Sequence, residues 1–250
     1  MKKIVLFLAI TIYSCSPAPS TKKASDFETL LESYYQESLS LFKLKGTYQG
    51  DTRYNDTLPN YLSEAFKTKA KAFYTNYLNQ VNTFDDISLT AEDLLSKKIL
   101  IWECEMSLKG MEFQKDLMPI DQMWGFQLSF GQLASGAGAQ PFNTVQDYEN
   151  WLVRIEGYLD WLQSAQSNMQ KGMKTGWVLP QALVKKVLPQ LKGMTRVDLD
   201  KHLFYNPARN FPISFTEEDK TRLSAAYKTM VLDQIVPAYT VLHDFMANEY

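Results

Sequence analysis

The residues that could carry chemistry are few. The chain has two histidines, His202 and His243, and neither lies in the HExxH pattern by which one helix presents two zinc ligands and a general base. The run Asp198–His202 gathers acids beside a histidine, but without further histidine or cysteine ligands we interpret it as a solvated polar turn. GxSxG and GxxxxGK[ST] are absent, as is a GxGxxG following a strand. The sequence therefore offers no catalytic, cofactor-binding or metal-binding motif.

The remaining reactive groups have structural interpretations. Glu103, Glu105 and Glu112 are interpreted as the exposed side of an amphipathic helix rather than as an acid–base pair. Cys104 is expected to be a small buried apolar residue. The second cysteine, Cys15, is expected to carry lipid, so no intrachain disulfide is predicted and stability must come from packing.

The N-terminus has the pattern of a targeting segment. Lys2 and Lys3 precede the apolar run Ile4–Ile12, which is too short to span a bilayer, and Ile-Tyr-Ser-Cys ends it. This resembles the bacterial lipobox, so we predict a signal peptide over 1–14, a lipid on Cys15 and a tether over 15–24. The alternative is an ordinary secretory signal with a chance cysteine. The expected location is the cell envelope, with the membrane as a partner on the periplasmic side or at the cell surface.

Composition limits the classes of protein and of partner that remain possible. The chain has 250 residues, 45% of them hydrophobic, and a formal net charge of -2. This is enough chain to bury the core of one large or two small domains. The near-neutral charge, without a basic run, argues against nucleic acid as a partner.

Helix signals dominate the rest of the chain and predict an all-α fold with long loops. Four hydroxyl residues are each followed three positions later by an acid, the N-terminal signature of a helix: Ser25 and Glu28, Thr90 and Asp93, Thr144 and Asp147, Thr216 and Asp219. Apolar spacing predicts helices over Asp26–Lys45, Tyr61–Val81, Ala91–Met111, Phe126–Leu133, Val145–Gln170, Gln181–Lys192 and Glu217–Tyr250.

Glycines and prolines should interrupt these helices. Gly46 and Gly50 are expected to end the first one, and Gly172 and Gly176 the fifth. Pro189 should kink or shorten the sixth helix, and Pro237 should bend the last. On the third helix we expect the apolar residues Leu94, Leu95, Trp102 and Met106 to make the packing face.

Two polar residues stand out in the long segment Phe113–Pro141. Asp121 and Gln122 interrupt an otherwise apolar MPIDQMW sequence, and buried polar groups need hydrogen-bond partners. Either they fasten the loop to helix ends, or they line one wall of a substrate cleft that a second domain completes. The loop itself is either functional or pinned against the helices by Trp124, Phe126 and Phe130.

An ordered series of motifs between Pro119 and Leu191 resembles one family. The series is PIDQ, a glycine, PF-x-T-x-x-DYE-x-W-L-x-R, M-x-K-G-x-x-x-G-x-x-x-P and KVLPQL. It resembles the bacterial domain of unknown function 885 family, secreted or lipid-anchored proteins that look like zinc peptidases. Arg154 matches an arginine of that pattern, either as a structural residue or as part of a cleft.

The resemblance implies a helical, metallopeptidase-like protein of which residues 25–250 would be the N-terminal part. The family's HExxH lies beyond Tyr250, so zinc is expected in that other half and this chain alone should be inactive. Consistent with truncation, we expect the apolar face of Tyr239, Leu242, Phe245 and Met246 to lack part of its cover. The alternative is a non-catalytic surface lipoprotein that binds peptides or a protein partner.

Overall fold

The computed structural model describes residues 21–250, and the predicted signal peptide and lipid-bearing Cys15 lie outside this part. The described chain is all-α, as predicted, and contains no strand. Its α-helices are α1 (Thr21–Leu41), α2 (Lys43–Tyr48), α3 (Glu64–Val81), α4 (Ala91–Gly110), α5 (Phe126–Ala134), α6 (Val145–Thr175), α7 (Gln181–Gly193), α8 (Asn206–Arg209), α9 (Glu217–Thr229) and α10 (Val236–Asn248). In residues 21–250, no helix is both long and apolar enough to cross a bilayer.

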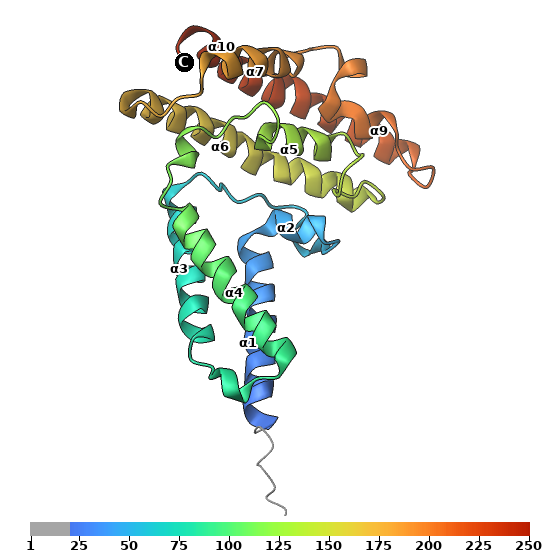
Figure 1. Ribbon diagram of the computed structural model, residues 1–250. Coiled ribbons are helices and arrows are strands. Elements are labelled where there is room, and N and C mark those ends of the chain that lie inside the picture. The colour runs from blue at the N-terminus through green and yellow to red at the C-terminus, as the bar shows by residue number, and fades with distance from the viewer. Residues whose placement is uncertain (1–20) are drawn as a thin grey trace, which may run out of the picture.

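Three helices form an elongated region that we call the arm. α1, α3 and α4 lie alongside one another in the lower half of Figure 1. Their shared core is small and rich in aromatic rings: Phe27, Leu30, Tyr34, Phe73, Tyr77, Val81, Leu100 and Cys104. Cys104 is a free, fully buried thiol, which confirms its predicted role, and burial raises its pKa to about 11. Glu105 and Glu112 are exposed as expected, whereas Glu103 is half-buried.

The other helices form the body, which is built around α6. This helix runs across the body, with α7, α9 and α10 on one side and α2 towards the arm (Figure 1). Its apolar face supplies the centre of a second, larger core. Phe130 of α5 stacks on Trp151 and Tyr158 of α6, with ring centroids 4.9 and 3.9 Å apart. The two regions therefore have separate cores.

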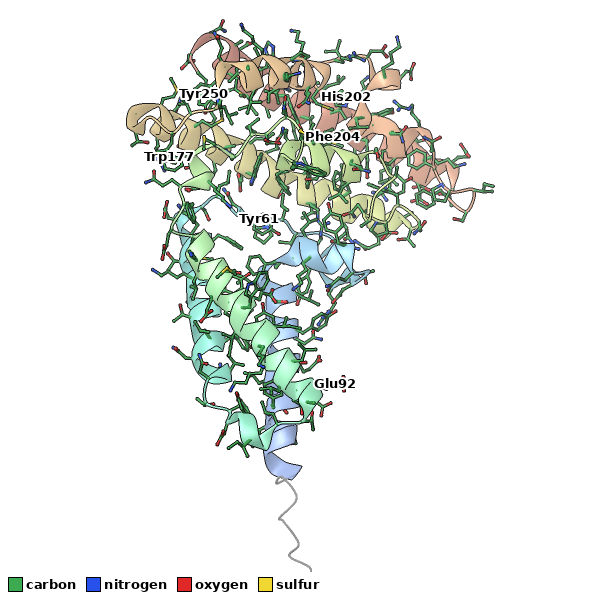
Figure 2. The ribbon with its side chains drawn as sticks, viewed as in Figure 1. Tyr61, Glu92, Trp177, His202, Phe204 and Tyr250 are labelled. Carbon is green, nitrogen blue, oxygen red and sulfur yellow. The ribbon has the colours of Figure 1, made fainter. Side chains whose placement is uncertain are left out.

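Tyr61 lies where the two regions meet, as Figure 2 shows. Its hydroxyl accepts a hydrogen bond from the backbone N–H of Leu44 at 3.3 Å. Its ring packs edge-on against Phe66 of α3 and Phe126 of α5, at 4.9 and 6.2 Å between centroids. One aromatic side chain thus contacts both the arm and the body.

Three of the four predicted helix starts are confirmed. The hydroxyls of Thr90, Thr144 and Thr216 accept hydrogen bonds from the backbone N–H three residues later, at 3.1, 3.2 and 3.1 Å. At Thr144 the Asp147 carboxylate also accepts from the Thr144 N–H, which completes a capping box. The expected cap at Ser25 is wrong, because α1 begins at Thr21 and the Ser25 carbonyl accepts from Thr29 within the helix.

Several predicted helix ends also need correction. The first predicted helix, Asp26–Lys45, is two helices, because α1 ends at Leu41 and α2 begins at Lys43. Gly46 lies inside α2, and only Gly50, with φ of +80°, follows the end of α2. α6 continues through Gly172 to Thr175 and ends at Gly176, whose φ of +81° favours glycine. α7 passes through Pro189 without being shortened. Pro189 removes one backbone hydrogen bond from the interior of α7, and we attribute the continuity of the helix to the burial of Val187 and Leu191 on either side of it.

Two predictions about apolar faces are wrong in opposite directions. Tyr239, Leu242, Phe245 and Met246 of α10 are all buried, because α7 and α6 cover them and Tyr250 folds back onto Phe245. On α4, by contrast, the expected packing residues Leu95, Trp102 and Met106 face solvent. The inward face of α4 is instead Lys97, Leu100 and Cys104.

Candidate functional site

Arg154 is a fully buried residue of α6 that joins distant segments. Its Nη1 donates to Oε1 of Gln140 at 2.6 Å, and its Nη2 donates to the Thr47 hydroxyl at 2.9 Å and to the carbonyl of Tyr54. Thr47 in turn donates to Oδ1 of Asn55 at 2.8 Å. The guanidinium therefore ties α6 to α2, to the 3-10 turn Thr52–Tyr54 and to the loop after α5.

The charge of Arg154 has no carboxylate partner among the described residues that hydrogen-bond it. Burial lowers the pKa of Arg154 to about 10, still well above neutral pH, so the group stays charged. Its Nε and the Nε2 of Gln140 are buried without a hydrogen-bond partner. Burying a cation among neutral acceptors costs free energy. We therefore interpret the Arg154 network as one that holds these segments in place, and not as a proton-transfer site.

Asp121 organises a short exposed turn. Its Oδ1 accepts from the backbone N–H groups of Met123 and Trp124, at 2.7 and 2.6 Å, and these bonds lower the pKa of its carboxyl group. The Asp121 carbonyl accepts from the Gln127 side chain, which tethers the turn to α5. Trp124 is 87% exposed, so the expectation that it pins the loop is wrong, whereas Phe126 and Phe130 do pack inward.

Gly125 explains why this turn can sit so close to α5. A Cβ at that position would lie 2.5 Å from the Asp121 carbonyl oxygen and 2.1 Å from Oε1 of Gln127. The neighbouring Gln122 contributes its backbone carbonyl, which accepts from Nε2 of Gln190 on α7 at 2.9 Å. Asp121 and Gln122 thus fasten the loop, and they share no hydrogen-bond partner with Arg154.

The histidines occupy unrelated places. His202 is buried in the body (Figure 2), not in a solvated turn as expected: its Nε2 lies 3.1 Å from the Met194 carbonyl and its Nδ1 accepts from the Phe204 N–H at 3.3 Å. Desolvation lowers the pKa of His202, so the neutral ring is favoured. Nδ1 of His243 lies 2.9 Å from the Asp244 carboxylate. In the described part of the chain, no three His, Cys, Asp or Glu side chains gather as metal ligands, so these residues do not fit a zinc site.

A groove between α6 and α10 is the feature best suited to bind a ligand. It has a volume of about 340 Å³, and we call it the α6–α10 groove. Apolar side chains and four polar ones line it: Leu159, Leu162, Gln163, Gln166, Asp233, Gln234, Pro237, Ala238, Val241 and Leu242. Concave apolar surfaces with a few polar groups are typical of ligand sites.

A π-helical turn over Met230–Ile235 forms one edge of this groove. The Val236 N–H donates to the Val231 carbonyl, five residues back, which widens the turn. Asp233 and Gln234 belong to this turn and line the groove, and Pro237 follows directly. Turns of this kind occur often at functional sites. The sequence predicted a bend at Pro237, and the structure has a π-helical turn directly before that proline.

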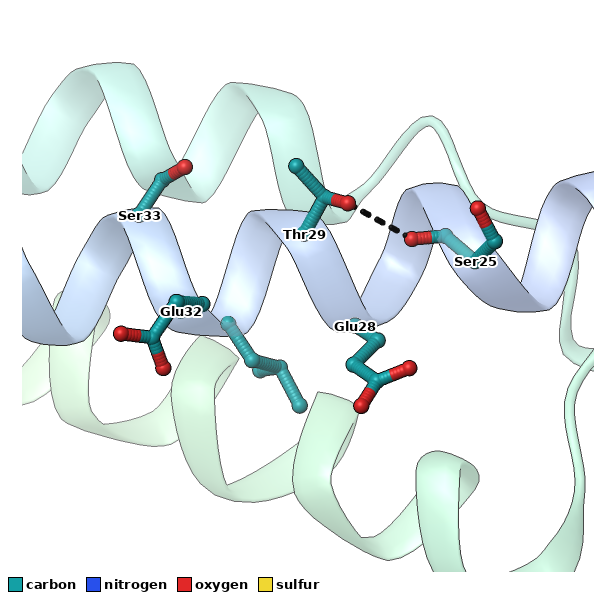
Figure 3. Close-up of a pocket in the computed structure, with 6 residues that line it drawn as sticks. Ser25, Glu28, Thr29, Glu32 and Ser33 are labelled. Atoms are coloured by element: carbon teal, nitrogen blue, oxygen red, sulfur yellow. Dashed lines mark hydrogen bonds between the residues drawn. The ribbon is translucent and has the colours of Figure 1, made fainter.

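A second hollow lies on the arm, along α1. Figure 3 shows Glu28 and Glu32 projecting on one side of the helix and Ser25, Thr29 and Ser33 on the other. The Thr29 hydroxyl is already used, because it donates to the Ser25 carbonyl at 2.8 Å. The lining comes from one helix and is largely exposed, so this hollow does not enclose a ligand.

The groove could not be recognised as a site from the sequence, although Pro237 and Leu242 of its lining were singled out for a helix bend and for an apolar face. Gln163, Gln166, Asp233 and Gln234 are ordinary polar residues of helices, and no motif marks them. Their only signal was Pro237 within an apolar helical pattern, which indicated an irregular helix. The convergence of α6 and α10 at this point depends on tertiary packing.

Comparisons with known proteins agree with this helical architecture. One solved structure, described as "The crystal structure of the putative lipoprotein from Colwellia psychrerythraea", aligns with a TM-score of 0.67 and 14% identity over 89% of this chain, which shows the fold. The match covers 41% of that protein, so the chain spans less than half its length. No curated protein matches. The model of the family described as bacterial protein of unknown function, DUF885, matches residues 44–250, and the chain belongs to this family.

Proposed function

We propose that this chain is the peptide-holding helical part of a lipid-anchored, peptidase-like protein of the cell envelope. The observation that carries the proposal is the α6–α10 groove, whose apolar floor is flanked by side-chain amides and one carboxylate. Amides can pair with the backbone of an extended peptide, and the apolar floor can take its side chains. The rest of the proposal, the likeness to a peptidase and the lipid anchor in the cell envelope, has three supports. These are the family membership, the longer solved structure of similar fold, and the N-terminal Lys-Lys and Ile-Tyr-Ser-Cys pattern.

In this proposal, zinc and the catalytic groups belong to the part of the protein beyond Tyr250. The residues described in this chain would hold and orient the peptide, and no catalytic step is assigned to them. The alternative, a non-catalytic lipoprotein that binds peptides, would use the same groove. Reading the coding sequence downstream of Tyr250 for HExxH and a later glutamate ligand separates the two.

The groove can be tested with two end-blocked octapeptides, one alternating leucine with lysine and one alternating leucine with glutamate. Because Asp233 is the only charged residue of the lining, the full chain should bind the lysine peptide more tightly, as measured by fluorescence anisotropy. Val241→Arg would place a bulky cation in the groove and should weaken binding at least tenfold. Asp233→Asn should reduce the preference for lysine.

Val153→Arg is the matched control. Val153 also lies on a helix surface, is 52% exposed compared with 57% for Val241, and does not line the groove. Its substitution should leave binding unchanged. Equal loss in both arginine variants, or equal affinity of the wild-type chain for the two peptides, would contradict a peptide site in this groove.

A further inference from the structure

Helix α4 is apolar on two opposite sides. Leu100 and Cys104 point into the arm core, with 4% and 0% of their surface exposed. On the other side, Leu95, Ile99, Trp102 and Met106 are 60%, 54%, 64% and 41% exposed, and we call these four residues the α4 stripe. In Figure 1, α4 lies on the near side of the arm, and α1 and α3 pack against its other side. The stripe is thus a continuous apolar surface that no described helix covers.

The spacing of the stripe indicates what could cover it. Its members are separated by four, three and four residues, which is the a and d pattern of a heptad repeat. A face of this width matches one further α-helix, because knobs at a and d fit into holes of a facing helix. Exposed apolar patches on soluble proteins commonly mark such contacts.

Charged residues along the edge of the stripe favour a second copy of α4. Lys98 and Glu105 both occupy g positions, on the same edge of the stripe, and both are exposed. When two such helices run antiparallel, g positions meet g positions, so Lys98 of each copy lies near Glu105 of the other. The pairing thus contributes two complementary charge pairs.

The sizes of the stripe residues agree with the same arrangement. In the antiparallel register, Trp102 faces Ile99 of the second copy, and Leu95 faces Met106, so a large ring meets a smaller branched side chain. In a parallel pair Trp102 would face itself. We propose that this protein self-associates through antiparallel pairing of α4, with the α4 stripe as the seam.

The test uses the full chain, produced in bacterial cells and treated with an amine-reactive crosslinker before lysis. The wild-type chain should give a crosslinked dimer, and Trp102→Asp should reduce its yield at least tenfold. Val153→Asp, on the exposed surface of α6, is the control and should leave the yield unchanged. Because Trp102 is mostly exposed, both variants should retain the wild-type circular dichroism spectrum and melting temperature.

Charge reversal tests the orientation without touching the apolar residues. For these variants the dimer fraction is measured by sedimentation velocity, because they change the number of amines available to the crosslinker. Lys98→Glu and Glu105→Lys should each lower the dimer fraction several-fold, and the double variant should restore it, because the two charges exchange places. In a parallel pair Lys98 would face Glu103 instead, so Glu105→Lys would have no effect and the double variant would not recover.

Three results would overturn the proposal. One is a wild-type chain that remains monomeric. If phosphatidylglycerol vesicles then shield Trp102 of this monomer from quenching by acrylamide, the α4 stripe would bind a lipid surface instead. Another is a dimer that survives Trp102→Asp. The third is the parallel pattern of charge reversals.

Discussion

The arm and the body use apolar residues differently. In the body, the described helices turn their apolar faces inward, and even the last helix, α10, is covered by α7 and α6. The arm covers only one side of α4 and leaves the α4 stripe in solvent. Both regions bury a few polar groups: Arg154 and His202 in the body, and Ser38 and Lys97 in the arm. The Lys97 ammonium donates to the Phe84 carbonyl and to Asp86, each at 2.6 Å. An apolar stripe in a sequence therefore identifies a face that favours contact, but it does not identify the partner.

The largest effect should come from the centre of the body. Phe130→Ala would remove a ring stacked between Trp151 and Tyr158, leaving a cavity that rigid neighbours cannot fill. We expect a loss of about 3–5 kcal/mol in the free energy of unfolding, measured by urea denaturation.

Together with a matched variant in the arm, Phe130→Ala tests whether the arm and the body unfold separately. Phe27 of the arm is equally buried, so Phe27→Ala is the matched change in the other core. In Phe27→Ala, hydrogen exchange should increase in α1, α3 and α4 while α6 stays protected. Equal acceleration of all amides in both variants would show that arm and body unfold as one unit.

The next effect concerns the buried cation. Arg154→Lys keeps the charge, but the single nitrogen of an ammonium group cannot replace two guanidinium nitrogens that bond three acceptors, so we expect a loss of about 2–4 kcal/mol in stability. Arg222→Lys is the control, since Arg222 pairs with Glu149 at the surface and should change stability by less than about 0.5 kcal/mol. Similar losses in both variants would mean that the Arg154 network contributes little.

A smaller, pH-dependent effect should come from His202. Its folded-state pKa is below the usual 6.5, so the unfolded chain takes up the proton first, and stability falls as the pH drops from about 6.5 towards the lower folded pKa. Thermal melts between pH 7.5 and 5 should show this decline, and His202→Gln should reduce its slope. His243→Gln should retain the wild-type slope, and an unchanged slope in His202→Gln would rule out His202 as its source.

The smallest effect is expected on the outer side of α4. Under dilute, monomeric conditions Leu95→Ala should alter the free energy of unfolding by less than about 0.5 kcal/mol, because its side chain already contacts water. Leu100→Ala, on the inner side of the same helix, should cost about 2–3 kcal/mol. If Leu95→Ala destabilised the monomer as much as Leu100→Ala, the outer side of α4 would be packed within the chain.

Local signals in the sequence predicted the helices well. The hydroxyl–acid pairs at Thr90, Thr144 and Thr216 depend on neighbouring residues alone, and each forms the expected cap. The all-α class followed from these caps and from apolar spacing. The ends at Gly46 and Gly172 were mispredicted, because a glycine within a helix costs only about 1 kcal/mol, which packing can offset.

Long-range features could not be predicted in this way. On α4 both sides are apolar, so periodicity could not tell which of Leu95 and Leu100 faces the core. Arg154 and Gln140 meet through tertiary packing, as do α6 and α10 at the groove. The separation of Asp121 and Gln122 from Arg154 likewise depends on how the long loop crosses the body.

The π-turn before Pro237 also keeps two halves of one long helix in phase. Each residue of an α-helix turns the chain by about 100°, so Tyr239 would point about 120° away from Tyr227 if the helix were uniform. Both side chains are nevertheless buried in the body core. The wider turn absorbs about one residue of rotation and brings both onto the same side. It therefore behaves as a one-residue insertion that displaces Asp233 and Gln234 towards the groove edge, and deleting one residue there should preserve the core while removing that edge.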